Sequence, residues 1–498
     1  MNSKNYINAV GNYLKANYRN INYLPYCYRV QDYLGWYMGE CQWHKYKIFN
    51  GKKWKNCIRK NLNMAKTCCE DFASLVLNEK VKIILSNRKS QIAVDNVLKD
   101  NNFWVMSNQL VELSYALGTG AFVESWVDDK VVIDYIHGDF VFPLKWDNGE
   151  ITECAFAIVG GDTLNDKITY TLLVHTKEDV EFEDGTIDER YVIKKIYLDA
   201  DGRIVKPYDM VSELNSEEED EEIFITNSKK PLFQIIKPNI VNNYDKTNPL
   251  GMSIFGNAIT ILQNIDMEYD SLYSEFEQGK KKTYVKSGIK TIDIKSKDDT
   301  TIKDVIDPND AQYYQIGDDE WENGKPPLYT SNEELRVDNH INGINLQLQL
   351  LSRKVGLGDG FYSFNGNTVA RTATEIISVN SSLFRNVRKF ELIIEKALID
   401  MSIVILSLLN DFGGGNYNLE QEISVNFDDS IIEDTDKVSQ NALLKYNAGL
   451  IDKVQYFVET ENMTREQAKK YVEEMDMTDT YKVQDNLLGG LGGFNVNE

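Results

Sequence analysis

One long run of helical spacing limits the possible folds more than any other feature of this sequence. Over residues 369–412, apolar side chains recur every three or four positions, as on one face of an α-helix. An unbroken helix over that run would be about 66 Å long, at 1.5 Å per residue. Compact enzymes seldom need such a helix, whereas an elongated subunit of an assembly can use it as a spine. The stripe consists of Ile376, Val379, Leu383, Val387, Phe390, Ile394, Ala397, Met401, Ile405 and Leu408.

Two shorter helical patterns bracket a segment of different character. Residues 253–278 and 332–355 show helical spacing, with Ser253 as the expected N-cap of the first helix and Gly279 as its stop. Between them, residues 283–330 are polar, with β-type runs and turn sequences, which predicts a small β subdomain hung between two helices. The second helix also has a polar but uncharged face, formed by Asn339, Asn342, Asn345, Gln347 and Gln349.

The remaining sequence mixes helices and strands, so we expect an α+β fold. The first 60 residues alternate aromatic and basic side chains, which fits either a nucleic-acid surface or a subunit interface. Short β-branched and aromatic runs between residues 122 and 238 predict antiparallel sheet with hairpins. Further helices are predicted at residues 62–79, 91–116, 435–448 and 464–475, and further strands at 81–85 and 423–427. At 498 residues, the chain is expected to form about three structural units.

Net charge and hydropathy exclude several classes of protein. The formal charge of −23 argues against a basic nucleic-acid coat, because neutralising phosphates requires Lys and Arg. No run of about 20 apolar residues is present to cross a membrane, and the N-terminus lacks the apolar region of a signal peptide. We therefore expect a soluble protein that is made in the cytoplasm and has no membrane partner.

The sequence contains no recognisable motif for a catalytic, metal or cofactor site. Five of the six cysteines lie at or before Cys69, near His44, but their spacing fits no standard zinc pattern, and structural thiols are the favoured interpretation. The acidic run at residues 213–222 is expected to be an exposed loop rather than a metal site. Phosphate-binding, nucleophile-elbow, metalloprotease and EF-hand motifs are missing. Two alternatives stay open: a monomeric hydrolase with a site built from distant residues, and a capsid-associated adaptor.

The order of these parts resembles the portal proteins of tailed bacteriophages. Two stretches carry the resemblance at residue level: residues 371–392, RTATEIISVNSSLFRNVRKFEL, are similar to the start of the family's spine helix in phages of Gram-positive hosts. Residues 36–44 and 61–80 are similar to the family's N-terminal region. The resemblance implies a wing (1–252), a first stem helix (253–282), a clip (283–331), a second stem helix (332–356), a tunnel loop (357–368), a spine helix with wing return (369–428), and a crown with a C-terminal tail (429–498).

That resemblance also implies a function and partners. It implies a homo-oligomeric ring of twelve subunits in the virion, at one capsid vertex, through which double-stranded DNA is packaged and ejected without sequence-specific binding. The terminase large subunit and head-completion or adaptor proteins would dock on the clip, and major capsid and scaffold proteins on the wing. No enzymatic activity and no cofactor are implied.

On this basis, a set of residues is expected to face the channel. Uncharged amides and a few rings of positive charge would give DNA weak and uniform contact. The channel-facing residues are Lys280, Lys281, Lys282, Asn345, Gln349, Arg353 and Lys354. The tunnel loop contributes Gly358, Asp359, Gly360, Phe361, Tyr362 and Phe364, whose aromatic rings either touch DNA or pack between subunits.

Overall fold

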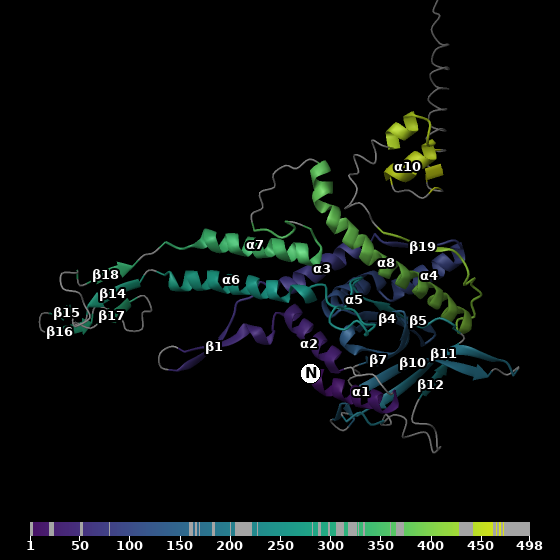
Figure 1. Ribbon diagram of the computed structural model, residues 1–498, viewed down its shortest axis with the longest axis horizontal. Helices are drawn as coiled ribbons and strands as arrows, with labels where there is room; N and C mark the ends of the chain where they lie inside the picture. The colour runs from purple at the N-terminus through teal and green to yellow at the C-terminus, as the bar shows by residue number, and fades with distance from the viewer. Residues whose placement is uncertain are drawn as a thin grey trace, which may run out of the picture. The chain divides into compact units, whose positions relative to one another are not determined.

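Two antiparallel β-sheets pack against each other in the computed structural model (Figure 1). The larger sheet has the strand order β12–β11–β10–β7–β6 and the smaller has the order β13–β4–β5. The strands of the larger sheet are β6 (Val141–Asp147), β7 (Glu150–Ile158), β10 (Tyr170–Glu181), β11 (Ile187–Leu198) and β12 (Glu222–Ile225). Those of the smaller sheet are β4 (Gly120–Val127), β5 (Lys130–His137) and β13 (Phe233–Ile236).

The structure describes most of the chain. The described residues are 3–18, 24–49, 53–78, 80–158, 163–164, 167–168, 170–181, 185–199, 201–204, 222–226, 228–280, 282–286, 290–296, 299–304, 313–316, 326, 328–331, 334–358, 360–364, 373–427, 442–461, 465, 468–469 and 472. They fall into two compact units, Met1–Val369 with Val379–Asn426, and Ala370–Ser378 with Phe427–Glu498. The sequence length suggested about three.

The larger sheet is buried on both faces because its strands carry apolar residues at consecutive positions, as at 154–157 of β7. One face packs on α1 (Ser3–Asn17), whose Val10 and Leu14 are fully buried against Leu172 and Val174 of β10. The other face packs on the smaller sheet, where Phe156 of β7 meets Phe233 of β13 at 5.2 Å between ring centroids. The order in space is therefore helix, sheet, sheet, and the helices described next lie beyond the smaller sheet (Figure 1).

Three helices share an aromatic core on that side of the smaller sheet. Phe390 of α8 (Ala373–Asp411) lies 5.2 Å from Phe72 of α3 (Met64–Val76) and 5.4 Å from Tyr115 of α5 (Phe103–Leu117), between ring centroids. All three rings are at most 3 % exposed. Burying a ring of this size stabilises a fold by about 2–3 kcal/mol, so this cluster fixes α8 against residues far earlier in the chain.

The remaining elements are shorter or stand apart from these layers. They are α2 (Leu24–Met38), η1 (Gln42–His44), β1 (Lys45–Phe49), β2 (Trp54–Ile58), β3 (Lys82–Leu85), α4 (Arg88–Asp100), η2 (Gly138–Phe140), β8 (Thr163–Leu164), β9 (Lys167–Ile168), η4 (Gly256–Ala258), α6 (Ile259–Gln278), β14 (Lys282–Lys286), β15 (Lys290–Ser296), β16 (Asp299–Asp304), β17 (Tyr313–Ile316), β18 (Leu328–Ser331), α7 (Val337–Val355), β19 (Ile423–Asn426) and α10 (Lys453–Glu461). β14 pairs with β17 in parallel and with β18 antiparallel. No helix of the described residues is both long and apolar enough to cross a membrane.

Most elements predicted from the sequence are found, and the mixed α+β class is confirmed. The long helix runs from Ala373 to Asp411, and every member of its predicted stripe from Leu383 onward is at most 5 % exposed. The expectations for residues 205–221, 365–372, 428–441 and 473–498 lie outside the described residues.

Two local predictions were wrong. Residues 91–116 form two helices rather than one, because Asn102 adopts a left-handed conformation (φ 47°) between α4 and α5. Ser253 does not cap α6, which begins at Ile259; instead its hydroxyl donates to the backbone carbonyl of Tyr115 over 3.2 Å. The helix therefore starts later than its apolar spacing indicated.

Candidate functional site: the α6–α7 helix pair and its adjoining loop

Helices α6 and α7 lie side by side and run antiparallel (Figure 1). At one level the Arg336 guanidinium binds the Glu275 carboxylate with two hydrogen bonds, of 3.1 Å from Nε and 2.8 Å from an Nη atom. One seven-residue step further along, Gly343 lies so close to Glu268 that an added Cβ would be 2.8 Å from its carboxylate oxygen. The matched positions move seven residues toward the C-terminus on α7 and seven residues toward the N-terminus on α6. The two helices are therefore antiparallel, with Glu275 level with Arg336 and Glu268 level with Gly343.

An apolar seam and the ion pair between Arg336 and Glu275 hold the two helices together. Ile265 of α6 and Ile344 and Leu351 of α7 are fully buried, at the positions that the helical spacing predicted. At the end of the pair, hydrogen bonds from Arg336 lower the pKa of Glu275 to about 2, so the carboxylate is ionised at any ordinary pH. Gly279 ends α6 there, with its N–H donating to the Glu275 carbonyl, as the sequence predicted.

A buried polar cluster anchors the middle of α6 to the N-terminal region. His44 Nε2 lies 2.9 Å from the Asp266 carboxylate, and the other carboxylate oxygen accepts the backbone N–H of Leu62 over 2.9 Å. Cys41 Sγ lies 3.3 Å from His44 Nδ1, and burial raises the pKa of its thiol, which favours the neutral, unreactive form. Within the described residues no group of three side chains is arranged to hold a metal ion. The contacts of Asp266 with His44 and Leu62 tie α6 to the N-terminal region.

The outward face of α7 carries a nearly uncharged stripe. Asn339, Asn342, Leu346, Gln349 and Arg353 are all exposed and recur at steps of three and four, so they lie along one face of the helix. Four of the five have no charge. Leu346 is 56 % exposed on this face. The sequence did not predict it there, because the expected face consisted of polar residues, and the nearby Ile344 and Leu348 belong to the buried stripe.

The predicted basic residues fall at opposite ends of this pair. Lys280 is exposed just beyond the C-terminus of α6, and Lys282 opens strand β14; Lys281 lies outside the described residues. Arg353 and Lys354 are exposed in the last turn of α7, where the helix dipole favours positive charge. By the antiparallel register, the two groups are about 30 Å apart along the helix axis.

Asn345 differs from the other predicted channel residues in its surroundings. Its side chain is 8 % exposed, and its amide oxygen accepts the backbone N–H of Phe364 over 2.8 Å. Within the subunit, Asn345 therefore holds the loop that follows α7.

That loop is anchored at several points by polar contacts. Ser352 Oγ accepts the backbone N–H of Tyr362 over 3.1 Å, and the Tyr362 hydroxyl donates to the Asp71 carboxylate of α3. Burial of this phenol, with Cys68 and Asp71 beside it, raises its pKa and keeps it protonated as a donor. Phe361 and Phe364 are 42 % and 51 % exposed, so the loop turns one aromatic ring inward and two outward.

The other predicted loop positions supply backbone freedom. Gly358 and Gly360 have φ values of 90° and 78°, which glycine adopts without strain. Gly358 is buried and Gly360 is exposed, while Asp359 lies outside the described residues.

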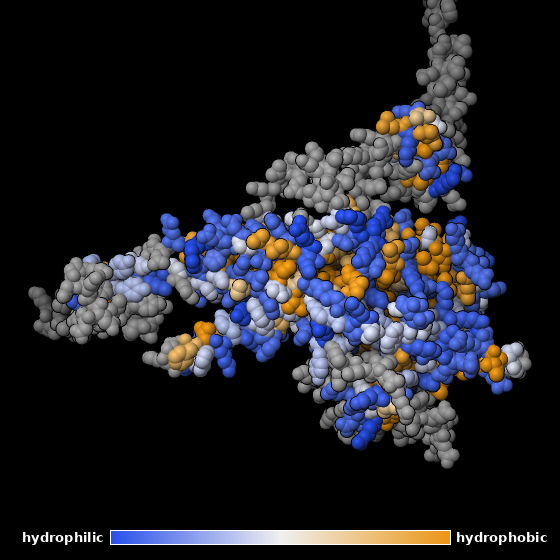
Figure 2. Space-filling model, viewed as in Figure 1, coloured by the Kyte–Doolittle hydropathy of each residue, from blue (hydrophilic) through white to orange (hydrophobic). Residues whose placement is uncertain are grey.

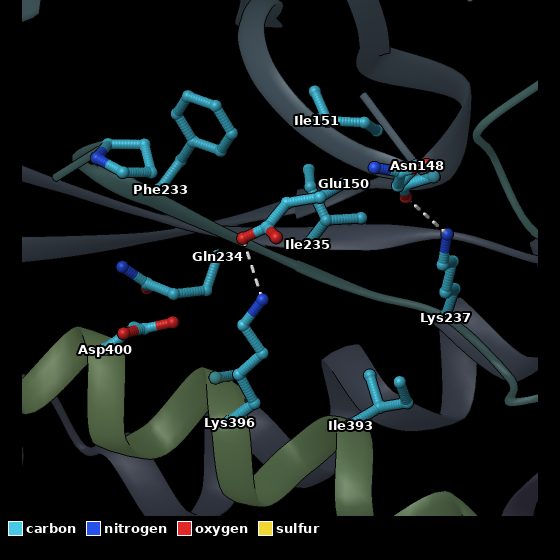
Figure 3. Close-up of a pocket in the computed structure, with 13 residues that line it drawn as sticks. Asn148, Glu150, Ile151, Phe233, Gln234, Ile235, Lys237, Ile393, Lys396 and Asp400 are labelled. Atoms are coloured by element: carbon cyan, nitrogen blue, oxygen red, sulfur yellow. Dashed lines mark hydrogen bonds and ion pairs between the residues drawn. The ribbon is translucent and has the colours of Figure 1, made fainter. Parts of the chain in front are cut away.

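A cavity of about 280 Å³ lies elsewhere, between α8, strand β13 and the β6–β7 turn (Figure 3). Its charged groups are already paired: Lys396 binds Glu150 over 2.7 Å, and Lys237 donates to the carbonyls of Gly149 and Pro249. Burial, with Lys396 nearby, lowers the pKa of Lys237. We interpret these contacts as structural links between α8 and the sheets, because the charged groups that line the cavity are already bound to other groups of the chain.

Comparison with known proteins decides the family. The family described as phage portal protein, SPP1 Gp6-like, matches residues 17–481, which is nearly the whole chain. The chain belongs to this portal protein family. The expectation of a portal protein is therefore confirmed, and with it the virion as the place where the protein acts.

Membership also decides between the functional classes. Portal proteins are structural components at the capsid vertex where phage DNA is packaged, so the portal assignment replaces the hydrolase and adaptor alternatives. An oligomeric assembly in the virion follows from the same membership.

Solved structures of phage-like particles also resemble this portal protein. A chain from the neck of an empty GTA particle has a TM-score of 0.38 and 11 % identity, covering 80 % of this chain and 88 % of its own. A chain from the virion of a native gene transfer agent (GTA) particle has a TM-score of 0.36 and 12 % identity, covering 79 % and 87 %. No curated protein sequence matches.

Proposed function

We propose that twelve copies of this portal protein form a ring whose channel is lined by the α6–α7 pair. In this proposal residues 1–252 are the wing, 253–282 and 332–356 the two stem helices, 283–331 the clip and 357–368 the tunnel loop. Residues 369–428 form the spine and wing return, and 429–498 the crown and tail. The antiparallel pair with β14, β17 and β18 at one end and an anchored loop at the other supports this assignment.

The single observation that carries the proposal is the exposed stripe on α7. A helix that faces solvent on the outside of a protein normally carries charges on its exposed face. Here Asn339, Asn342, Leu346 and Gln349 leave that face uncharged over about 15 Å. Amides offer DNA neither the attraction of Lys and Arg nor the repulsion of carboxylates, which suits a surface past which a duplex must slide.

Charge elsewhere supports weak contact with DNA. Twelve copies at −23 each would carry about −276, a field that repels phosphate. Basic rings would then act only at the two ends of the stem, from Lys280 to Lys282 and from Arg353 with Lys354. Phe361 and Phe364 would stand next to the second ring, on the outward side of the loop.

The partners follow from the same arrangement. We place the terminase large subunit and the head-completion or adaptor proteins at the clip, and the major capsid and scaffold proteins at the wing. Double-stranded DNA would pass through without sequence-specific contact, since every base pair of the genome must move past the same side chains.

A charge inserted in the stripe tests the lining directly. Asn342→Lys and Gln349→Lys would each add twelve positive charges to the channel wall and should reduce the yield of DNA-filled particles, while rings still assemble. Asn96→Lys, at an exposed position of α4, is the matched control and should package normally. Normal packaging by both stripe variants would show that α7 does not face DNA.

A further inference from the structure

The β1–β2 hairpin leaves one whole face uncovered. Its register pairs Lys45 with Ile58, Lys47 with Asn56 and Phe49 with Trp54, so these six side chains share a face. Ile58 is 69 % exposed, Trp54 67 % and Phe49 57 %. Figure 2 shows the hydrophobic patch at this hairpin. A two-stranded hairpin is only marginally stable in water without a partner for its apolar face.

The base of the opposite face is held by the chain's own helix, while Ile48 nearer the tip is 44 % exposed. Tyr46 and Cys57 are half-buried on that side, and the backbone N–H of Lys60 donates to Asp270 of α6 over 2.9 Å. The Arg59 guanidinium stacks on Trp43 and Tyr46, 4.3 and 4.5 Å from the ring centroids. The base of the hairpin is therefore fixed, and its free face cannot be covered by folding back onto α6.

The hairpin is also strongly basic in an acidic protein. Residues 45–60 contain seven Lys or Arg and no Asp or Glu, which leaves a charge of −30 on the rest of the chain. Among the described residues, Lys45 and Lys47 on this face have no carboxylate within ion-pair distance, and neither has Lys55 on the opposite face. A partner for this face must therefore combine apolar side chains with negative charge.

We propose that this face packs on the neighbouring copy of the same chain in the portal ring. A second copy presents the required chemistry: near the C-terminal end of its α6 the exposed Glu277 carries a negative charge beside Tyr273 and Phe276, which are 44 % and 48 % exposed. In this contact the hairpin of one subunit meets a different surface of the next subunit. Such head-to-tail interfaces can close into rings. This inference rests on the ring of the proposed function.

DNA is the other polyanion that the lysines would attract, but it fits the face less well. Contacts to a duplex backbone go to phosphates, which need Lys or Arg and leave Ile58 without a partner. The rings of Phe49 and Trp54 could stack on bases only in single strands, whereas the packaged genome is a duplex. Together the three apolar side chains expose on the order of 400 Å², which fits a protein interface.

Site-specific photo-crosslinking in the full-length chain tests the contact. A benzophenone amino acid at position 54 should give a covalent two-chain product in assembled rings, mapped by mass spectrometry. The same amino acid at Ile187, which is 68 % exposed on β11, is the matched control and should give much less. Irradiation of rings with a labelled duplex provides the second arm: a protein–DNA product at position 54 without the two-chain product would overturn the proposal.

A variant measures what the contact contributes. Phe49→Ser with Trp54→Ser should raise the concentration for half-assembly, followed by mass photometry, at least about tenfold, because buried aromatic anchors dominate interfaces. Far-UV circular dichroism of the subunit should not change, since both side chains are exposed. Unchanged assembly together with no crosslink would refute the hairpin contact but leave the ring intact. A wild-type chain that never forms rings would instead refute the proposed function and the contact with it.

Discussion

Replacing Glu124 by glutamine should make the first unit markedly more stable at alkaline pH. Glu124 of β4 is fully buried: one carboxylate oxygen accepts from Gln234 Nε2 over 3.1 Å and the other has no partner among the described residues. Burial raises the pKa of this carboxyl to about 8, from 4.5 when exposed. The folded protein therefore keeps a proton that the unfolded chain releases from about pH 4.5 upward.

The size of the effect follows from linkage. Between pH 4.5 and 8 the folded state binds more protons at Glu124 than the unfolded state, so stability falls as pH rises. The cost is about 1.4 kcal/mol at pH 5.5 and about 4.6 kcal/mol at pH 8.5, taking 1.36 kcal/mol per pH unit. Glutamine does not titrate, and its NH₂ group can donate to the otherwise unpartnered Gln234 oxygen.

Calorimetric melting at both pH values measures this difference. We expect the gain from Glu124→Gln to be about 3 kcal/mol larger at pH 8.5 than at pH 5.5, or roughly 3 °C in Tm for a unit of this size. Glu420→Gln, at an exposed position, is the control and should shift Tm equally at both pH values. An equal shift for Glu124→Gln would refute the claim that this carboxyl is neutral in the folded protein.

Three further changes probe the core, the loop and the helix pair. Burial lowers the pKa of His175 to about 3, so the folded protein keeps this imidazole neutral while the unfolded chain gains a proton below pH 6.5. His175→Phe should therefore increase the free energy of unfolding by about 2 kcal/mol more at pH 5 than at pH 7.5, measured by calorimetry. An equal effect at both pH values would contradict this. Tyr362→Phe removes the hydrogen bond to Asp71 and should speed hydrogen exchange at residues 360–364 without changing assembly; unchanged exchange would mean that the bond does not hold the loop. Gly343→Val brings a side chain against the Glu268 carboxylate, the far end of a flexible side chain that can turn away, so α6 and α7 should keep their protection from hydrogen exchange; faster exchange in both helices would show that Glu268 cannot move aside.

Local patterns in the sequence predicted the elements that bury one continuous face. The spine helix is the clearest case, because a stripe repeating every three or four residues requires no knowledge of what it packs against. Gly279 was equally predictable, since a glycine after the last apolar turn is a common helix stop. The break at Asn102 was not, because a left-handed asparagine is not distinguished by its type from a helical one.

The candidate site depends on contacts that no local pattern contains. His44 and Asp266 are 222 positions apart, and Tyr362 and Asp71 are 291 apart, so only the folded chain brings them together. Asn345 illustrates the same limit: its residue type fits the uncharged stripe, but its position on the helix turns it toward Phe364. Composition identified an uncharged face on α7, and the position of each residue on the helix decides which of its members are exposed.

Cryo-electron microscopy of the purified full-length protein decides whether the ring and its proposed lining exist. We predict closed rings of about 690 kDa for twelve subunits of 57.2 kDa, with the face of α7 that carries Asn342 and Gln349 turned toward the central hole. Rings in which that face is buried between subunits or turned outward would contradict the proposed channel lining, and particles of a single 57.2 kDa chain would contradict the ring itself.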